Sequence, residues 1–80
     1  MKDKHQKYFD LVGKNLRQLR KNKGLSQQDL SNLCDVDRAK ISTIETAKED
    51  FVFTTLLELA DALQVNPKLL LDFGVDFKEK

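Results

Sequence analysis

The chain has 80 residues, of which 40% are hydrophobic and 34% charged, a balance typical of a folded soluble protein and not of a disordered one. So short a chain forms one domain and leaves little room for an enclosed catalytic cleft. The net charge is only +1, but residues 1–24 carry eight Lys or Arg against two Asp or Glu. A local basic face of this kind attracts phosphates, although an ordinary solvated helix surface explains the same charges.

The sequence shows no signal for export or membrane insertion. Its first ten residues lack the apolar core of a signal peptide, and no stretch approaches the roughly 20 apolar residues of a membrane span. The single cysteine, Cys34, cannot form an intramolecular disulfide, which fits a reducing compartment. We therefore expect a cytoplasmic protein in which Cys34 is a small core residue, because no catalytic partner accompanies its thiol.

The first helix is expected to run from about His5 to Lys23. Its apolar residues recur at spacings of three and four, which places them on one face. Gly24 is expected to end this helix in a left-handed conformation. The apolar stripe consists of Phe9, Val12, Leu16 and Leu19.

Two short helices follow. Ser26 and Asp29 are spaced as a capping box, which predicts a helix that begins at this serine. A tight turn is expected at Asp35, a residue type that tolerates the left-handed conformation. Asp37 is expected to cap a third helix over Arg38–Glu45.

The fourth helix is predicted to begin at Thr54 or Thr55, after a loop over residues 46–52. Apolar residues then follow the helical period from Leu56 to Leu63.

A fifth helix is predicted from the pair Asn66 and Pro67, which combines a helix cap with a proline at the first helical position. Leu69 and Leu70 are expected to face inward, and Gly74 to end the helix.

Each of these helices needs a partner for its apolar face, so all five are expected to collapse around one core. The sequence thus predicts a compact all-α, five-helix fold. A single domain spans residues 1–80, with a core over 9–73 and flexible ends at 1–5 and 75–80.

The segment from Ser26 to Glu45 has the form of a DNA-binding helix-turn-helix, with two short helices joined by a tight turn. The second helix fits the major groove, where Arg reads guanine and small or hydroxylated side chains meet thymine methyls and base edges. Its outward face is small and polar, unlike a face built only for packing. That face consists of Arg38, Ala39, Ser42 and Thr43.

Two stretches resemble the Cro/repressor-type helix-turn-helix proteins, also called the xenobiotic-response-element family. They read VGKNLRQLRKNKGLSQQDLSNLCDVDRAKISTIE and FTTLLELADALQVNPKLLLDF, and the resemblance extends over roughly residues 9–73. The resemblance implies a lambda-repressor-like DNA-binding domain whose helices 2 and 3 form the helix-turn-helix. The run Val36-Asp37-Arg38, with Ile41-Ser42 and Ile44-Glu45, is also similar to the controller proteins of restriction–modification systems.

The resemblance implies a role for each matching position. Gln27 corresponds to a glutamine that packs on a phosphate and reaches the first base pair, although an ordinary solvated residue is the alternative. The residues expected to contact base edges are Arg38, Ala39 and Thr43. Contacts to the groove or to phosphates are expected from Lys40, Ser42 and Lys48. Arg20 and Glu45 correspond to a structural ion pair and are assigned to the scaffold, not to DNA.

Several positions depart from the family pattern. Asp35 stands where the family often has glycine. The loop after the third helix contains Glu49 and Asp50, which repel phosphates, and Asp37 places negative charge at a helix N-terminus. These departures predict fewer phosphate contacts and a shallower dependence of binding on salt.

A second apolar surface is expected outside the core, because exposed apolar residues often mark an interface. Phe53 matches a core position of the family. The family commonly dimerises through its C-terminal helices and nearby loops, although these side chains could equally complete the core of so small a domain. The residues predicted to contribute to a dimer interface are Phe51, Val52, Leu57, Leu71 and Phe73.

No residue pattern indicates catalysis, a metal site or a cofactor. His5 has no second metal ligand at helical spacing, and the carboxylates form no acid/base pair. The sequence predicts a non-enzymatic transcriptional regulator, for instance a repressor, that binds a pseudo-palindromic operator as a homodimer. Two alternatives remain open: an antitoxin-like module that binds another protein through the same fold, and a scaffold without affinity for DNA.

Overall fold

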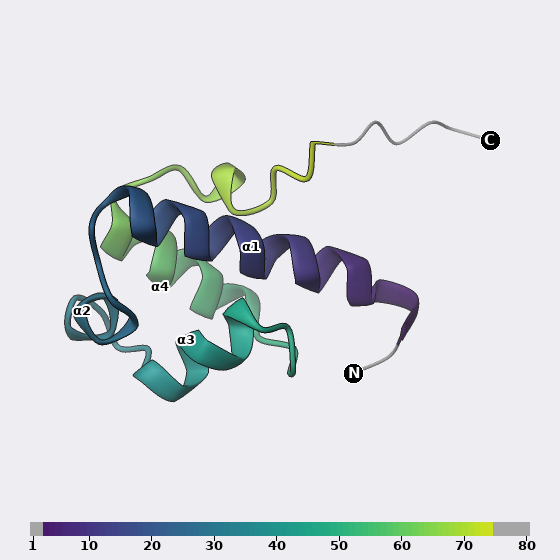
Figure 1. Cartoon of the computed structure of the whole chain (residues 1–80), viewed down its shortest axis with the longest axis horizontal. Helices are drawn as coiled ribbons and strands as arrows, with labels where there is room; N and C mark the ends of the chain where they lie inside the picture. The colour runs from purple at the N-terminus through teal and green to yellow at the C-terminus, as the bar shows by residue number, and fades with distance from the viewer. Residues whose placement is uncertain (1–2, 75–80) are drawn as a thin grey trace.

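The computed structural model describes residues 3–74, and within that range all regular structure is helical (Figure 1). A 3-10 turn, Asp3–His5, leads into the long helix α1, Gln6–Asn22. α2 covers Gln27–Asn32, α3 covers Arg38–Glu45 and α4 covers Phe53–Leu63. The all-α class is confirmed, and α3 has the bounds predicted from its sequence.

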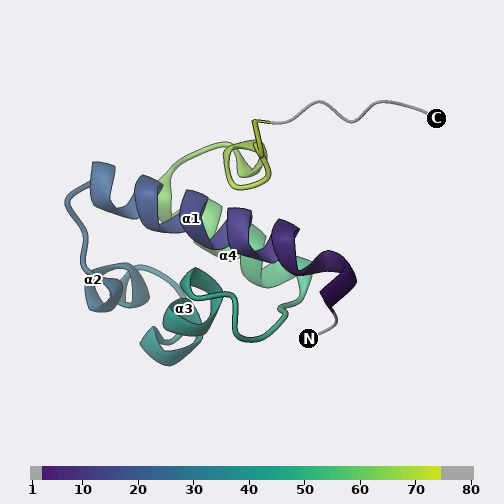
Figure 2. The same cartoon turned by 45° about the vertical axis from the view of Figure 1, so that its right-hand side comes forward.

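The helices are arranged around α1. In both views α1 separates α2 and α3 from the segment that follows α4 (Figures 1 and 2). From the predicted stripe of α1, Val12 and Leu16 are buried, whereas Phe9 and Leu19 are half-buried at its edges. The buried core cluster is contributed by all four α-helices and the C-terminal segment. It consists of Val12, Leu16, Leu30, Val36, Ile41, Ile44, Leu56, Leu59, Ala60, Leu63 and Leu70.

Three helix ends follow the sequence signals closely. Gly24 is left-handed, with φ of 72°, just after α1. At the start of α2 the Asp29 N–H donates to Ser26 Oγ and the Ser26 N–H to Asp29 Oδ2, both at 2.9 Å, which completes the capping box. At α3 the Lys40 N–H donates to Asp37 Oδ1 at 2.8 Å, so Asp37 is the predicted cap.

The turn between α2 and α3 is tight, as predicted, but Asp35 does not have the left-handed conformation suggested for it. Among the described residues other than glycine, only Ala47 and Gln64 have a positive φ, so Asp35 is not left-handed. The N–H groups of Leu33 and Cys34 donate to carbonyls three residues earlier, at 3.0 and 3.3 Å. The chain therefore leaves α2 through a tightened right-handed turn, and no left-handed residue is needed there.

The fifth helix was also predicted wrongly, because the cap at Asn66 starts only a 3-10 turn, Pro67–Leu69. A longer helix requires the Leu70 carbonyl to accept the N–H of Gly74. Instead Asn15 on α1 donates its amide N–H groups to the carbonyls of Leu70 at 3.0 Å and Asp72 at 2.8 Å. These tertiary bonds hold the segment in an irregular course along α1.

Ending the helix early separates the two leucines expected to face inward. Leu70 is buried in the core, whereas Leu69 is 39% exposed. Residues 75–80 and 1–2, which belong to the ends predicted to be flexible, lie outside the described residues. Within the described range, no helix is long and apolar enough to cross a membrane.

α1 and α3 approach each other closely at Gly13. A Cβ atom at this position would lie 2.5 Å from the carbonyl oxygen of Ile44 and 2.7 Å from that of Glu45. Because these are backbone atoms, they cannot move aside cheaply, so only glycine permits this distance between the helices. The contact therefore fixes the distance between α3 and α1.

Candidate nucleic-acid interface

α3 has one buried and one accessible face. Ile41 and Ile44 are buried in the core, whereas Arg38 and Ala39 are exposed in the first turn of the helix. Ser42 and Thr43 are half-buried and follow on the same side, at the spacings of a helix surface. All four residues predicted to form the reading face are therefore accessible on one helix.

The two hydroxyls of this face differ in what they can offer. Thr43 Oγ1 donates to the carbonyl of Lys40 at 2.9 Å, so its proton is already used and its methyl group and lone pairs remain. No hydrogen bond within the described residues engages the Ser42 hydroxyl, although the Ser42 carbonyl accepts one from Thr46 Oγ1 at 2.8 Å. Thr43 is thus suited to apolar or acceptor contacts, and Ser42 to either role.

Arg20 of α1 and Glu45 of α3 form a paired, buried salt bridge. Arg20 Nε donates to Glu45 Oε2 at 2.7 Å and Nη2 to Oε1 at 2.9 Å, while Nη1 donates to the carbonyl of Leu25 at 2.7 Å. The two side chains are 8% and 4% exposed. The hydrogen bond to Glu45, opposed by burial, raises the pKa of Arg20 above its usual value. The pair fixes the end of α3 to α1 and to the loop before α2.

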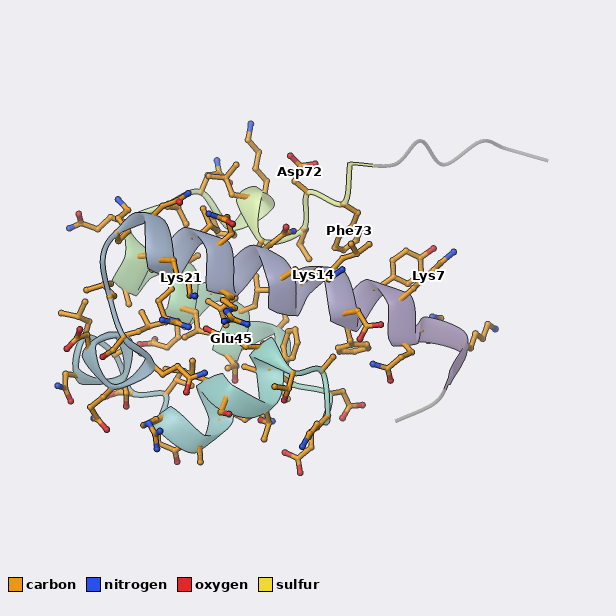
Figure 3. All side chains as sticks on the ribbon, in the orientation of Figure 1. Lys7, Lys14, Lys21, Glu45, Asp72 and Phe73 are labelled. Carbon is orange, nitrogen blue, oxygen red and sulfur yellow. The ribbon has the colours of Figure 1, made fainter. Side chains whose placement is uncertain are left out.

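Gln27, the first residue of α2, also reaches this ion pair. Its Nε2 donates to Glu45 Oε1 at 3.2 Å, and the residue is half-buried. The sequence predicted contact with DNA for Gln27 and a scaffold role for Glu45, but gave no sign that the two side chains touch. Figure 3 shows Glu45 on the side of α1 that faces α3.

Lys40 is not a free surface cation. Its Nζ donates to the carbonyl of Asp50 at 2.9 Å, across the loop between α3 and α4. The same loop is held from the other side by Gln6, whose Nε2 donates to the carbonyl of Ala47 at 3.1 Å. Lys48, between these two anchor points, is exposed. The loop is therefore fixed to both α1 and α3, and Lys40 partly offsets its acidic residues.

Basic residues also follow the outer face of α1. Lys7, Lys14 and Lys21 are exposed and succeed one another at intervals of seven residues, which returns them to nearly the same side of the helix (Figure 3). Arg17 is exposed as well. These four residues are half of the eight Lys and Arg in residues 1–24.

An apolar groove of about 270 Å³ opens between α1, the start of α4 and the C-terminal segment. Within it, the ring of Phe51 meets Phe9 edge-on, with centroids 5.4 Å apart, and the ring of Phe73 lies 5.6 Å from that of Tyr8. The lining residues are Tyr8, Phe9, Val12, Phe51, Phe53, Leu56, Leu71 and Phe73.

The structure divides the residues predicted for a dimer interface. Val52, Leu57 and Leu71 are 65%, 39% and 43% exposed, whereas Phe51 and Phe73 are half-buried and pack on the core cluster. The expectation that Phe53 lies in the core is wrong, since it is 62% exposed. The reason is its place at the first turn of α4, where its side chain forms a wall of the groove.

Three residues that position these surfaces were not predicted. Gly13 sets the distance between α1 and α3, Asn15 fastens the C-terminal segment, and Gln6 holds the loop after α3. Each acts through a partner far away in the sequence, 41 to 57 residues for the two side-chain amides. For Gln6 and Asn15, the one local sign of such a role is a polar side chain beside the apolar stripe of α1. This sign does not identify the residue that the side chain binds.

The chain belongs to a helix-turn-helix domain family, which it matches over residues 11–73. It is a transcriptional regulator of the helix-turn-helix type, homologous to restriction–modification controller proteins. The control protein C.BamHI of Bacillus amyloliquefaciens is 39% identical to it over 64 residues, which make up 79% of each chain.

Several solved structures share the fold. The restriction–modification controller protein C.AhdI of Aeromonas hydrophila matches with a TM-score of 0.75 and 35% identity, over 78% of this chain and 94% of its own. The hypothetical transcription factor NHTF of Neisseria matches with a TM-score of 0.76 and 31% identity, over 80% of this chain and 74% of its own. These proteins are named as regulators and not as enzymes.

Proposed function

We propose that the protein regulates transcription by inserting α3 into the major groove of a specific DNA site. Arg38, Ala39 and Thr43 face the base edges in this arrangement. The observation that carries the proposal is the two-sided character of α3: Ile41 and Ile44 are buried on its inner face, whereas the outer face leaves Arg38 and Ala39 exposed and Ser42 and Thr43 partly exposed. The outer side chains are small or forked, as reading of base edges requires.

Contacts to the DNA backbone set the register of α3. Ser42 and Lys48 are accessible for this role, and the basic stripe of α1 adds a longer-range attraction. Lys40 Nζ binds the carbonyl of Asp50 with one of its three N–H groups, which leaves two for a phosphate. Because Glu49 and Asp50 oppose phosphates nearby, binding should depend on salt less steeply than in a fully basic relative.

We further propose that two copies bind together. Two recognition helices about 34 Å apart reach successive major grooves on one face of the duplex, which predicts a pseudo-palindromic site. The apolar groove and the exposed side chains of Val52, Leu57 and Leu71 supply a surface for the second copy. The relatives named as control proteins suggest restriction–modification genes as the regulated genes, with repression as the expected sign.

Selection of bound sequences from a random DNA pool, at two salt concentrations, tests this proposal. We expect an enriched sequence with two inverted half-sites. Arg38→Ala should weaken binding to that site by about 1–3 kcal/mol and relax the preference at one base position. If Arg38→Ala weakens binding to the selected site and to a scrambled site equally, Arg38 contacts only phosphates. If no sequence is enriched from the pool, specific binding is refuted.

The groove also supports a second candidate, an antitoxin-like module that covers an apolar surface of another protein. Sedimentation of the purified chain separates the two uses of the groove. A dimer that dissociates on Leu71→Glu, with loss of operator binding, supports the regulator. If the chain is a monomer that binds DNA with full affinity, the groove is not a dimer interface and a different protein partner is supported.

A further inference from the structure

The orientation of the Gln27 amide is determined by the chemistry of its partner. The carboxylate of Glu45 can only accept hydrogen bonds, so the side-chain nitrogen of Gln27 must be the atom that faces it, at 3.2 Å. The carbonyl oxygen, on the opposite branch of the amide, is then turned away from Glu45. Within residues 3–74, no donor is bound to this oxygen.

The acceptor itself is held rigidly. Both oxygens of Glu45 receive N–H groups from Arg20, and the Glu45 side chain is 4% exposed. The third N–H group of Arg20 is bound to the carbonyl of Leu25, two residues before Gln27. The ion pair thus joins the end of α3 to the start of α2 and keeps the amide of Gln27 in one orientation.

We propose that Gln27 presents its carbonyl oxygen to DNA and accepts a hydrogen bond from a base amine, and that Glu45 is the positioning residue that makes it do so. In the major groove the amines are N6 of adenine and N4 of cytosine. A phosphate is a poor partner for this oxygen, because both groups are acceptors. The inference rests on the proposed binding of DNA; the family resemblance implies that Gln27 reaches a base pair, and the contact to Glu45 specifies which atom of its amide does so.

Base analogues that lack a single amine test the proposal directly. In the selected site, each adenine is replaced in turn by purine and each cytosine by 2-pyrimidinone, and binding is measured for the unchanged protein and for Gln27→Met. At one position we expect the analogue to weaken binding of the unchanged protein about three- to tenfold, the range for one net hydrogen bond. The penalty specific to that amine should disappear in Gln27→Met, which keeps the length of the side chain.

Two results would overturn the assignment. One is that no analogue distinguishes the two proteins. The other is that neutral methylphosphonate at one phosphate abolishes the difference between them, which would show that the second N–H of Gln27 binds the DNA backbone. If the unchanged protein binds no site at all, the proposed function fails instead, so the two failures are distinguishable.

Glu45→Gln tests the positioning role. A neutral amide at this position can offer an N–H group, so it allows Gln27 to turn its oxygen inward and its nitrogen outward. We expect the preference at that position to move toward guanine or thymine, whose exposed atoms accept hydrogen bonds. A folded Glu45→Gln protein with an unchanged preference would contradict the role of Glu45. If this variant does not fold, the analogue experiment still decides the role of Gln27.

Discussion

The pair formed by Arg20 and Glu45 gives the strongest expected effect on stability. Replacing Arg20 by methionine removes the bonds to Glu45 and to the Leu25 carbonyl, and leaves a carboxylate only 4% exposed without its cation. Breaking a buried pair from one side costs about 3–5 kcal/mol. Because small domains are stable by only about 5–15 kcal/mol, a large part of the total would be lost.

Thermal and urea unfolding followed by circular dichroism measure this loss. A domain of this size changes its Tm by about 4–8 °C per kcal/mol, so Arg20→Met should melt at least about 12 °C lower. The double variant Arg20→Met/Glu45→Leu removes both charges, and an apolar replacement of a buried pair is often neutral or stabilising. We therefore expect the double variant to be more stable than Arg20→Met alone. The reasoning would be refuted if Arg20→Met lost less than about 1 kcal/mol of unfolding free energy. It would also be refuted if the loss in the double variant equalled the sum of the losses in the two single variants.

Three further changes test other parts of the fold. Gly13→Ala should destabilise by about 1–3 kcal/mol in urea unfolding, because its Cβ meets a backbone oxygen at 2.5 Å; the gain of about 1 kcal/mol typical of an unhindered helical site would contradict this. Gln64→Gly should stabilise by about 1 kcal/mol, since Gln64 is exposed at φ of 58°, while the control Gln64→Ala should leave the Tm nearly unchanged. Hydrogen bonds from Ser26, first its backbone N–H and then its side chain, lower the pKa of Asp29, so its stabilisation is present at neutral pH and lost as the pH falls below the ordinary value of 3.8. The difference in Tm between the unchanged protein and Asp29→Asn should accordingly narrow in acid, and a constant difference would argue against the capping charge.

The parts of the fold that depend on local chemistry were predictable from the sequence. Caps at Ser26 and Asp37 and the glycine at Gly24 act on backbone groups within a few residues, so their effect is the same in most tertiary settings. The cap at Asp37 is why the start of α3 was predicted correctly. The same cap signal at Asn66 predicted a fifth helix that does not form. Asn15 on α1 instead donates hydrogen bonds to two carbonyls of the segment that follows.

The features that the sequence could not supply are those set by distances between helices. From the sequence alone, Gly13 is an ordinary glycine within a helix. Only the structure shows that the carbonyl of Ile44 occupies the space that a side chain would need. Phe53 matched a core position, yet its place in the first turn of α4 puts it at the rim of a groove. Gln27 could be assigned to the DNA-facing surface by resemblance, but the direction of its amide depends on Glu45, which is 18 residues away.

The account depends on the outer face of α3 being the surface that enters DNA. Titration of isotope-labelled protein with the selected duplex, followed by NMR, observes this face residue by residue. We expect the largest shifts at Arg38, Ala39 and Thr43, with contacts between the Ala39 methyl and base protons. Shifts confined to the apolar groove, with α3 unaffected, would contradict the account.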